Sequence, residues 1–175
     1  MMVDEEYTIR NATPSEYLEI GELMVQAYSM LDGFPNADEQ PDYYEMLASI
    51  GKQTVNPQVE LLAALSSTGK IAGAVVYFGD MTYYVSGGSA CEEKNAAGFR
   101  LLAVASTARG RGIGKRLTCH CIEKAKQSGR MQLIIHTTAS MQIAWRMYEG
   151  LGFKRSVDLD FDQGELPVFG FRLTL

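Results

Sequence analysis

The sequence predicts a mixed α/β fold: one domain over residues 1–175, in which a central twisted mixed sheet of about seven strands packs against about four helices. Short apolar runs bounded by turn residues are typical of strands. They alternate with stretches whose apolar residues recur every three or four positions, as in amphipathic helices. A chain of 175 residues that is 46% hydrophobic and 21% charged can bury one core and is not disordered.

The first fifty residues predict one strand and two helices. The strand is expected at residues 7–10. Residues 13–16 read Thr-Pro-Ser-Glu, which places an N-cap threonine, a proline at the first helical position and a glutamate three residues after the cap. This is a helix start. A loop over residues 31–40 contains glycine and proline, and the proline at position 41 opens a second helix that ends near residue 50.

A hairpin is predicted in the middle of the chain. Strands over residues 59–65 and 71–78 flank a Ser-Ser-Thr-Gly turn. Gly73 within the second strand indicates a bulge or a close backbone approach. Residues 81–98 are expected to extend the hairpin to about residue 85 and then form a long loop of the kind that often serves binding. Tyr83 or Tyr84 could face a substrate there, although strand packing is the more common role.

The second half of the chain predicts strands that alternate with helices. A buried strand over residues 99–104 precedes a helix whose apolar face recurs every four residues from Ile113. The next strand covers residues 131–138, and strand–helix–strand in close succession is a right-handed crossover between parallel strands. A helix over residues 142–150 follows. Two last strands, at 153–161 and 166–173, flank an Asp-Gln-Gly turn.

The loop between the strand at 99–104 and the next helix has the composition of an anion site. The first N–H groups of a helix have no partner within it, and the helix dipole is positive at that end. Glycines let a phosphate approach the main chain closely. The loop combines three glycines with four cations: Gly110, Gly112, Gly114, Arg109, Arg111, Lys115 and Arg116. A flexible solvated turn with basic residues is the alternative interpretation.

Two common phosphate-binding patterns do not fit this loop. The dinucleotide fingerprint G-x-G-x-x-G would need glycine at position 115 or 117, where the chain has Lys115 and Leu117. The P-loop would need glycine at position 109 and serine or threonine at 116, where both residues are arginine. The pattern that remains is R-x-x-G-x-G, directly after an apolar strand.

A second motif follows about thirty residues later. Residues 144–153 read A-x-x-x-Y-x-x-x-G-F, with Tyr148 as the tyrosine. In this order and spacing, the two motifs resemble those of the GNAT superfamily of acetyl-CoA-dependent acetyltransferases, most strongly over residues 99–153. The resemblance implies an N-acetyltransferase that moves an acetyl group from acetyl-CoA to a primary amine by direct attack.

The resemblance also implies roles for particular residues. In the family the glycine loop holds the pyrophosphate of coenzyme A, and backbone at the end of the preceding strand stabilises the oxyanion. The cofactor-binding residues expected here are Ala103, Val104, Arg109, Gly110, Arg111, Gly112, Ile113, Gly114 and Lys115. The family's tyrosine corresponds to Tyr148, whose phenol can donate a proton to the departing thiolate.

Two positions depart from the family pattern, and no general base is assigned. The asparagine that often stands seven residues before the tyrosine is Met141, which removes one expected cofactor contact; a common proline is Ser106. The ammonium of an acceptor must lose a proton before attack. By residue type, the candidates for this base are Asp80, Glu92, Glu93 and His136. A relay through water is the alternative.

An acidic interval provides a hypothesis about the acceptor. Residues 31–51 contain Asp32, Asp38, Glu39, Asp42 and Glu45, with no lysine or arginine. In similar proteins the connection between the first two helices often borders the acceptor site. The interval therefore predicts a cationic acceptor, or else it is a solvated acidic face.

Other function classes remain as alternatives. A non-catalytic acyl-CoA binding or sensing domain could have the same fold, since a fold does not fix a function. Such a domain would not need Tyr148. A phosphate- or nucleotide-binding module unrelated to coenzyme A is disfavoured by the two failed patterns above.

Charge and cysteine usage narrow the partners. A net charge of −5 disfavours nucleic acid. Cys91, Cys119 and Cys121 suit neither a disulfide framework nor a metal site, so no metal is expected. The acidic N-terminus does not resemble a signal peptide and no apolar run could span a bilayer, which predicts a cytoplasmic protein without a membrane partner. A homodimer is frequent among similar proteins and is the oligomeric state to test.

Overall fold

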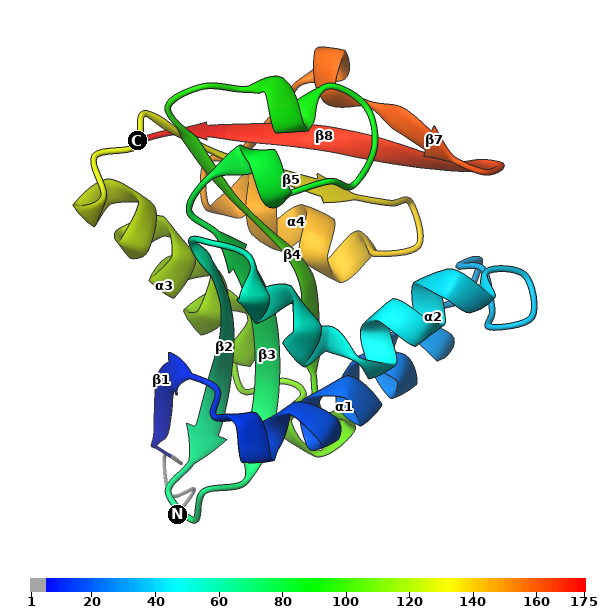
Figure 1. Ribbon diagram of the computed structural model, residues 1–175, viewed down its shortest axis with the longest axis vertical. Helices are drawn as coiled ribbons and strands as arrows, with labels where there is room; N and C mark the ends of the chain where they lie inside the picture. Colours follow the sequence, from blue (N-terminus) through cyan, green and yellow to red (C-terminus); the bar gives the residue numbers. More distant parts are fainter. Residues whose placement is uncertain (1–5) are drawn as a thin grey trace.

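The computed structural model describes residues 6–175 and has the expected mixed α/β fold (Figure 1). One eight-stranded sheet has the strand order β1-β2-β3-β4-β5-β8-β6, and β7 pairs with β8. The strands are β1 (Tyr7–Asn11), β2 (Val59–Ser66), β3 (Ile71–Phe78), β4 (Ala96–Val104), β5 (Gln132–Thr137), β6 (Lys154–Arg155), β7 (Phe161–Gln163) and β8 (Leu166–Thr174). The α-helices in this part of the chain are α1 (Tyr17–Ser29), α2 (Pro41–Ala48), α3 (Ile113–Gln127) and α4 (Gln142–Gly150).

The sheet is antiparallel except where β4 meets β5. These two strands pair in parallel, as the predicted crossover requires, but only over Ala96–Gly98 and Gln132–Ile134. β4 continues to Val104 and β5 to Thr137. Because pairing stops while both strands continue, they part in the middle of the sheet.

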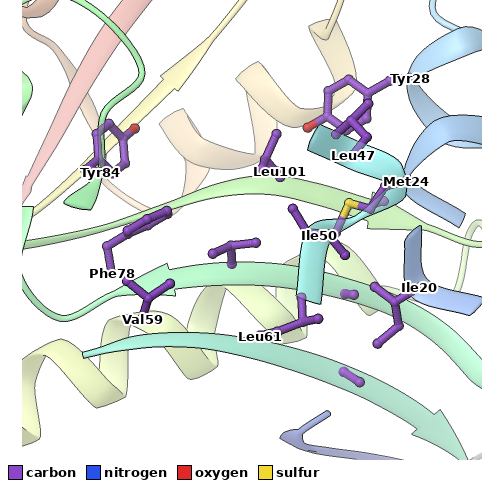
Figure 2. Close-up of a cluster of buried hydrophobic side chains, with 14 of the residues drawn as sticks. Ile20, Met24, Tyr28, Leu47, Ile50, Val59, Leu61, Phe78, Tyr84 and Leu101 are labelled. Atoms are coloured by element: carbon purple, nitrogen blue, oxygen red, sulfur yellow. The ribbon is translucent and has the colours of Figure 1, made fainter. Parts of the chain in front are cut away.

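Helices cover both faces of the sheet, and each face has its own core. α1 and α2 lie on one face, and α3 and α4 on the other (Figure 1). Side chains alternate along β2, so that Leu61 packs beneath α1 and α2 while Leu62 packs beneath α3. Figure 2 shows the first core, in which Ile20 and Met24 of α1 meet Leu47 of α2. Both cores rest on β4, which therefore has a fixed position between them.

The N-terminal helix starts at the predicted place. A short 3-10 turn, Pro14–Glu16, leads into α1. The Glu16 carboxylate accepts the Thr13 backbone N–H at 2.8 Å and pairs with Arg10 at 2.8 Å. The hydrogen bonds from Arg10, followed by those from Thr13, lower the pKa of Glu16 to about 2.

Two strand predictions were wrong. Residues 81–85 do not extend the hairpin: Asp80 accepts the Thr82 N–H at 2.8 Å and starts a 3-10 turn at Met81–Tyr83. Residues 153–161 are not one strand either, since only β6 and, at the far end, Phe161 of β7 pair there. The chain then turns so that Leu159 packs against Gly170, where an added Cβ would lie 2.3 Å from the leucine Cβ.

Some predictions about location and assembly are not decided by the fold. No helix in residues 6–175 is both long enough and apolar enough to cross a bilayer. Residues 1–5, on which part of the targeting prediction rests, lie outside the described residues. The cytoplasmic location and the homodimer stay predictions.

Candidate active site

A cavity of about 580 Å³ lies where β4 and β5 part. Its walls come from β4, the glycine loop, the start of α3, the end of α1 and the first turns of α4. Eight of the nine predicted cofactor-binding residues line it: Ala103, Val104, Arg109, Gly110, Gly112, Ile113, Gly114 and Lys115. Tyr148 lines the same cavity.

The glycine loop has a backbone that only glycine adopts readily. Gly110 has a φ of 77° and Gly112, the N-cap of α3, has a φ of 74°, both in the left-handed region. A Cβ added at either position would meet nothing within 4 Å, so the loop leaves open space beside its main chain. The unpaired N–H groups of the first turn of α3 adjoin this space. A pyrophosphate group fits such a cradle.

Two of the four cationic side chains of the loop line the cavity, and the other two point toward β1. Arg109 and Lys115 line the cavity. Arg111 does not: its Nη1 donates to the Tyr7 hydroxyl at 3.3 Å. Arg116 Nη2 donates to the Tyr7 carbonyl at 2.7 Å. These two arginines therefore fasten the loop and α3 to β1, and two cations remain for an anion in the cavity.

Gly73 explains how α3 comes so close to the sheet. A Cβ at this position would lie 2.9 Å from the Ala103 carbonyl oxygen and 2.9 Å from Ile113 Cγ2. The β2–β3 register shifts beside it, between Ala64 and Leu65. The predicted close approach is confirmed, and it seats the first residue of α3 directly on β3 and β4.

β4 has an irregularity that the sequence analysis missed. Its register against β3 shifts between Ala74 and Val76, and Leu101 within it has a φ of 61°. A left-handed leucine is strained, and such strain is typical of bulges beside functional sites. Together with the end of the β5 pairing, the bulge exposes the last part of β4 to the cavity. Leucine carries no sequence signal for this conformation.

Tyr148 lies on α4 with its ring in the core and is 5% exposed. Its ring centroid is 5.9 Å from that of Phe99 and 5.7 Å from that of Phe153. Its hydroxyl has no hydrogen-bond partner among residues 6–175. Burial raises the pKa of Tyr148 above its ordinary value near 10, so the phenol stays protonated. Tyr148 therefore provides a neutral hydrogen-bond donor on a residue that lines the cavity.

His136 lines the cavity but has no free nitrogen for a general base. Its Nδ1 lies 2.9 Å from the Tyr84 hydroxyl and its Nε2 lies 2.8 Å from the Leu159 carbonyl oxygen. A carbonyl only accepts, so this hydrogen-bond network assigns the proton to Nε2 and makes Tyr84 the donor to Nδ1. Burial lowers the pKa of His136, which favours the neutral ring.

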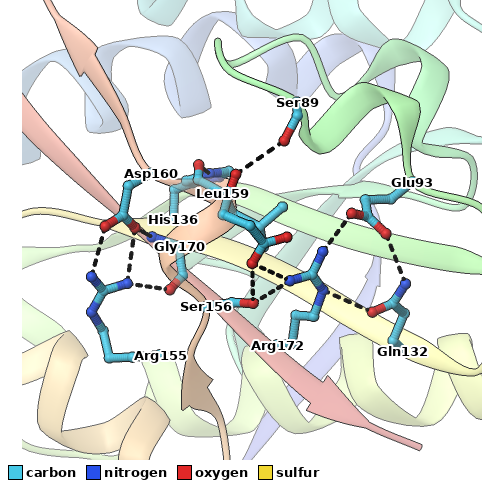
Figure 3. A network of polar contacts seen from close by, with 11 residues as sticks. Ser89, Glu93, Gln132, His136, Arg155, Ser156, Leu159, Asp160, Gly170 and Arg172 are labelled. Atoms are coloured by element: carbon cyan, nitrogen blue, oxygen red, sulfur yellow. Dashed lines mark hydrogen bonds and ion pairs between the residues drawn. The ribbon is translucent and has the colours of Figure 1, made fainter.

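The three carboxylates that were candidates for the general base lie away from the cavity. None of Asp80, Glu92 and Glu93 lines it. Glu93 pairs with Arg172, which also donates to Asp158 at 2.7 Å (Figure 3). This network joins the loop before β4 to β8. The two tyrosines of that loop are also placed: Tyr84 is fully buried, and Tyr83 packs partly buried beside the core.

None of the described residues that line the cavity is acidic. None of the five carboxylates of residues 31–51 reaches it. Met141, at the position where similar proteins often have asparagine, lines it, and so does the neighbouring Gln142. A further lining residue, Arg100, was missed by the sequence analysis, because an arginine in a strand usually faces solvent.

The class of the protein follows from a match to a family model. Residues 21–153 match the model of the Acetyltransferase (GNAT) family, which covers most of the sheet, the glycine loop and Tyr148. The chain belongs to this GNAT acetyltransferase family.

Solved structures share the fold across nearly their whole length. An acetyltransferase of the GNAT family from Staphylococcus aureus superposes with a TM-score of 0.74 at 18% identity, covering 97% of this chain and 99% of that one. The PaiA N-acetyltransferase of Thermoplasma acidophilum, solved with coenzyme A, has a TM-score of 0.70 at 14% identity over 94% and 98%. The Salmonella typhimurium protein yncA, solved with its cofactor acetyl-CoA, has 0.64 at 19% over 97% and 94%.

Curated relatives match only part of the chain. N-acetylaspartate synthetase of Danio rerio is 38% identical over 64 residues, which is 37% of this chain and 23% of the relative. The same-named protein of Xenopus tropicalis is 34% identical over 86 residues, 49% of this chain and 28% of the relative. The chain thus matches about a quarter of the length of these relatives.

Proposed function

We propose that this protein is an N-acetyltransferase that uses acetyl-CoA as co-substrate and a primary amine as acceptor. One observation carries the proposal: the glycine cradle at the start of α3 and the side chain of Tyr148 belong to residues that line the same cavity. The first feature suits the pyrophosphate of coenzyme A, and the second suits the chemistry of a leaving thiolate. Two of the solved relatives hold acetyl-CoA or coenzyme A, which supports this choice of co-substrate.

The residues of the cavity divide the work of binding. The first N–H groups of α3, with Arg109 and Lys115, would hold the pyrophosphate by charge-assisted hydrogen bonds. N–H groups alternate between the two edges of a strand, and Ala105 donates to Ala72 of β3, so the N–H of Ala103 also faces β3. Of these two residues, Val104 would offer its main-chain N–H to the thioester oxygen. A fixed position of the co-substrate removes much of the entropic barrier to the transfer.

The transfer itself needs few side chains. Acetyl-CoA supplies an activated acetyl group. The acceptor nitrogen bonds to the acetyl carbon while the carbon–sulfur bond breaks, and Tyr148 gives its proton to the departing sulfur. The nitrogen loses one proton to solvent, and a second proton from solvent restores Tyr148. The products are an acetamide and the coenzyme A thiol.

Removal of the acceptor's proton is assigned to water. No carboxylate of residues 6–175 lines the cavity, and both nitrogens of His136 are engaged. A chain of water molecules in the open cavity is the remaining route for the proton of an ammonium acceptor. The rate should then follow the fraction of free amine.

The proposed reaction requires an amine on the acceptor, but it does not require the acceptor to carry a net positive charge. The cationic acceptor predicted from residues 31–51 depends on carboxylates that do not line the cavity. They could act only at its entrance. The relatives are named for an N-acetylated amino acid, which agrees with transfer to an amino group.

A non-catalytic acyl-CoA sensor on the same fold is the second candidate. It would bind acetyl-CoA equally well, but it gives no reason for a protonated tyrosine at the cavity. The Tyr148 arrangement therefore favours the enzyme.

Calorimetric titration with acetyl-CoA, beside dephospho-coenzyme A and ADP, tests the proposal first. We expect micromolar binding of acetyl-CoA, followed by release of free thiol when amines are added. Absence of binding would remove the proposed co-substrate. Binding without transfer to any amine would favour the sensor.

A further inference from the structure

We propose that the acceptor carries a carboxylate beside its amine, and that Arg100 binds this carboxylate inside the cavity. The inference rests on the proposed acetyl transfer and specifies its acceptor class. It replaces the cationic acceptor that the acidic interval suggested.

Arg100 is separated along β4 from the cations of the glycine loop. The strand runs along the cavity from Arg100 to Val104, which is about 13 Å at about 3.3 Å per residue. Arg109 and Lys115 lie beyond that end, in the loop and at the start of α3. Around Arg100 the walls instead come from Tyr28 of α1 and His136 of β5. The cavity therefore has a second cationic region, away from the phosphate cradle.

The guanidinium of Arg100 is held in place by one of its nitrogens. Nη1 donates to the Tyr84 carbonyl at 3.2 Å and to the Val85 carbonyl at 3.1 Å. The carbon of the guanidinium lies 5.8 Å from the centroid of the Tyr84 ring. Nε and Nη2 make no hydrogen bond within residues 6–175. One edge of the planar guanidinium, Nε and Nη2, is thus pre-positioned and left to donate hydrogen bonds to a ligand.

Arg100 also has no counter-ion in this part of the chain. Five cationic side chains in residues 6–175 are partly buried, and three of them, Lys124, Arg155 and Arg172, pair with carboxylates at 3.0, 2.7 and 2.7 Å. Arg100 and Arg130 form no ion pair there. Of these two, only Arg100 lines the cavity. A partly buried charge without a partner is costly, so a ligand that supplies the partner gains binding energy.

A carboxylate is the partner that fits this fork. Guanidinium and carboxylate groups form two parallel hydrogen bonds, which fixes orientation as well as charge. Within the described part of the chain, no acidic side chain lines the cavity to compete for Arg100. The same lack of carboxylates disfavours a polycationic acceptor, which would enter beside three cations with nothing to neutralise it. Amino acids and related amino-carboxylates combine the required amine with the required acid.

Acetyl transfer to matched acceptors tests the inference. Thiol release would be followed with glycine, β-alanine and L-aspartate, each beside its fully amidated form, and with putrescine as a cationic amine. We expect at least one acid to exceed its amide in kcat/KM by tenfold or more. In Arg100→Gln that ratio should fall to about one through a higher KM for the acid, with the KM for acetyl-CoA within twofold. Arg100→Lys should retain part of the preference.

Arg130→Gln is the matched control, because Arg130 is also partly buried and forms no ion pair within residues 6–175, but lies outside the cavity. It should leave the ratio of acid to amide unchanged. The inference is overturned if no acid in the panel is acetylated, if the wild-type protein prefers amides or putrescine, or if Arg100→Gln slows acids and amides equally. Transfer to amides or putrescine alone would still uphold the proposed N-acetyltransferase, whereas loss of all transfer would also contradict that function.

Discussion

Tyr84 and His136 are joined by a hydrogen bond of 2.9 Å between the phenol oxygen and Nδ1, although 52 positions separate them in the chain. The bond links the loop after β3 to the C-terminal end of β5. Tyr84 is fully buried, and its backbone carbonyl accepts from Arg100. Tyr84 thus helps to hold Arg100 of the proposed carboxylate site, and His136 acts there as a structural residue that holds Tyr84.

This pair predicts a pH dependence of stability. Burial lowers the pKa of His136, so the unfolded chain binds a proton more readily than the folded chain. Stability from this residue is therefore complete above about pH 6.5, the ordinary histidine value, and is lost as the pH falls below it. The loss is at most about 1.4 kcal/mol per pH unit. Urea unfolding at pH 7.5, 6.5 and 5.5 should show the decline, and His136→Gln should reduce it.

The other histidine is the control for that experiment. Burial also lowers the pKa of His120, which lies partly exposed on α3. Since His120 is less buried, His120→Gln should change the decline less than His136→Gln does. An unchanged decline in His136→Gln would mean that the ring is not held neutral by its surroundings.

Tyr148→Phe tests the proposed proton donor. The ring packs among Phe99 and Phe153, and phenylalanine preserves that packing. We expect kcat to fall by about 10²–10⁴, the usual contribution of general acid–base catalysis, with little change in the Kd of acetyl-CoA. Because the pKa of Tyr148 is raised, the wild-type kcat should show no loss from its ionisation up to pH 9. A kcat within threefold of wild type would rule out the role.

Gly112→Ala separates the effect of the glycine cradle from that of backbone strain. Alanine in the left-handed region costs about 1–2 kcal/mol of stability, and its Cβ would occupy the open space beside the loop. Acetyl-CoA affinity should fall as well. Gly69, in the β2–β3 turn, has a φ of 82° and equally open space, so Gly69→Ala is the matched control. It should lose similar stability and no affinity; equal affinities for the two variants would contradict the assignment.

Asp160→Asn tests the contacts that hold the turn at Leu159, whose carbonyl accepts the hydrogen bond from His136 Nε2. Asp160 pairs with Arg155 at 2.7 Å and accepts the Gly170 N–H at 2.7 Å (Figure 3). These contacts hold the turn that carries the Leu159 carbonyl. We expect a loss of about 1–3 kcal/mol at pH 7, measured by urea unfolding.

The same variant has a pH signature. The hydrogen bonds from Arg155 lower the pKa of Asp160, so its contribution is present above the ordinary carboxyl value near 4 and is lost as the pH falls below it. The difference between wild type and Asp160→Asn should therefore shrink in acid. A constant difference down to pH 3 would assign the loss to altered packing instead.

Local patterns predicted those parts of the fold that depend on neighbouring residues. The helix start at residues 13–16, the hairpin turn and the strand–loop–helix around Gly112 all follow from short-range rules, and each is where the sequence placed it. The close approach at Gly73 was also predictable, because few other reasons put glycine inside a buried strand. Spacing of two motifs was enough to indicate the family.

Features that depend on distant contacts were not predictable in this way. The direction of Arg111 is decided by Tyr7, which lies 104 positions away. The left-handed Leu101 and the place of Arg100 follow from the register of β4 between β3 and β5, which no local pattern encodes. The expected strand at 153–161 failed because packing of Leu159 on Gly170 overrides a β-rich composition.

Three residue pairs, Ala96–Gln132, Ala97–Leu133 and Gly98–Ile134, provide all the ladder pairing between the first four strands and the later ones in the described chain. The sheet therefore consists of two parts, β1–β4 and the later strands, which are joined by one short ladder, here called the seam. A small rotation about this seam would change the width of the gap between the ends of β4 and β5 and leave every other ladder intact. The amides of the seam are thus where hydrogen exchange would report opening and closing of the molecule, and ligands that fill the gap should slow that exchange.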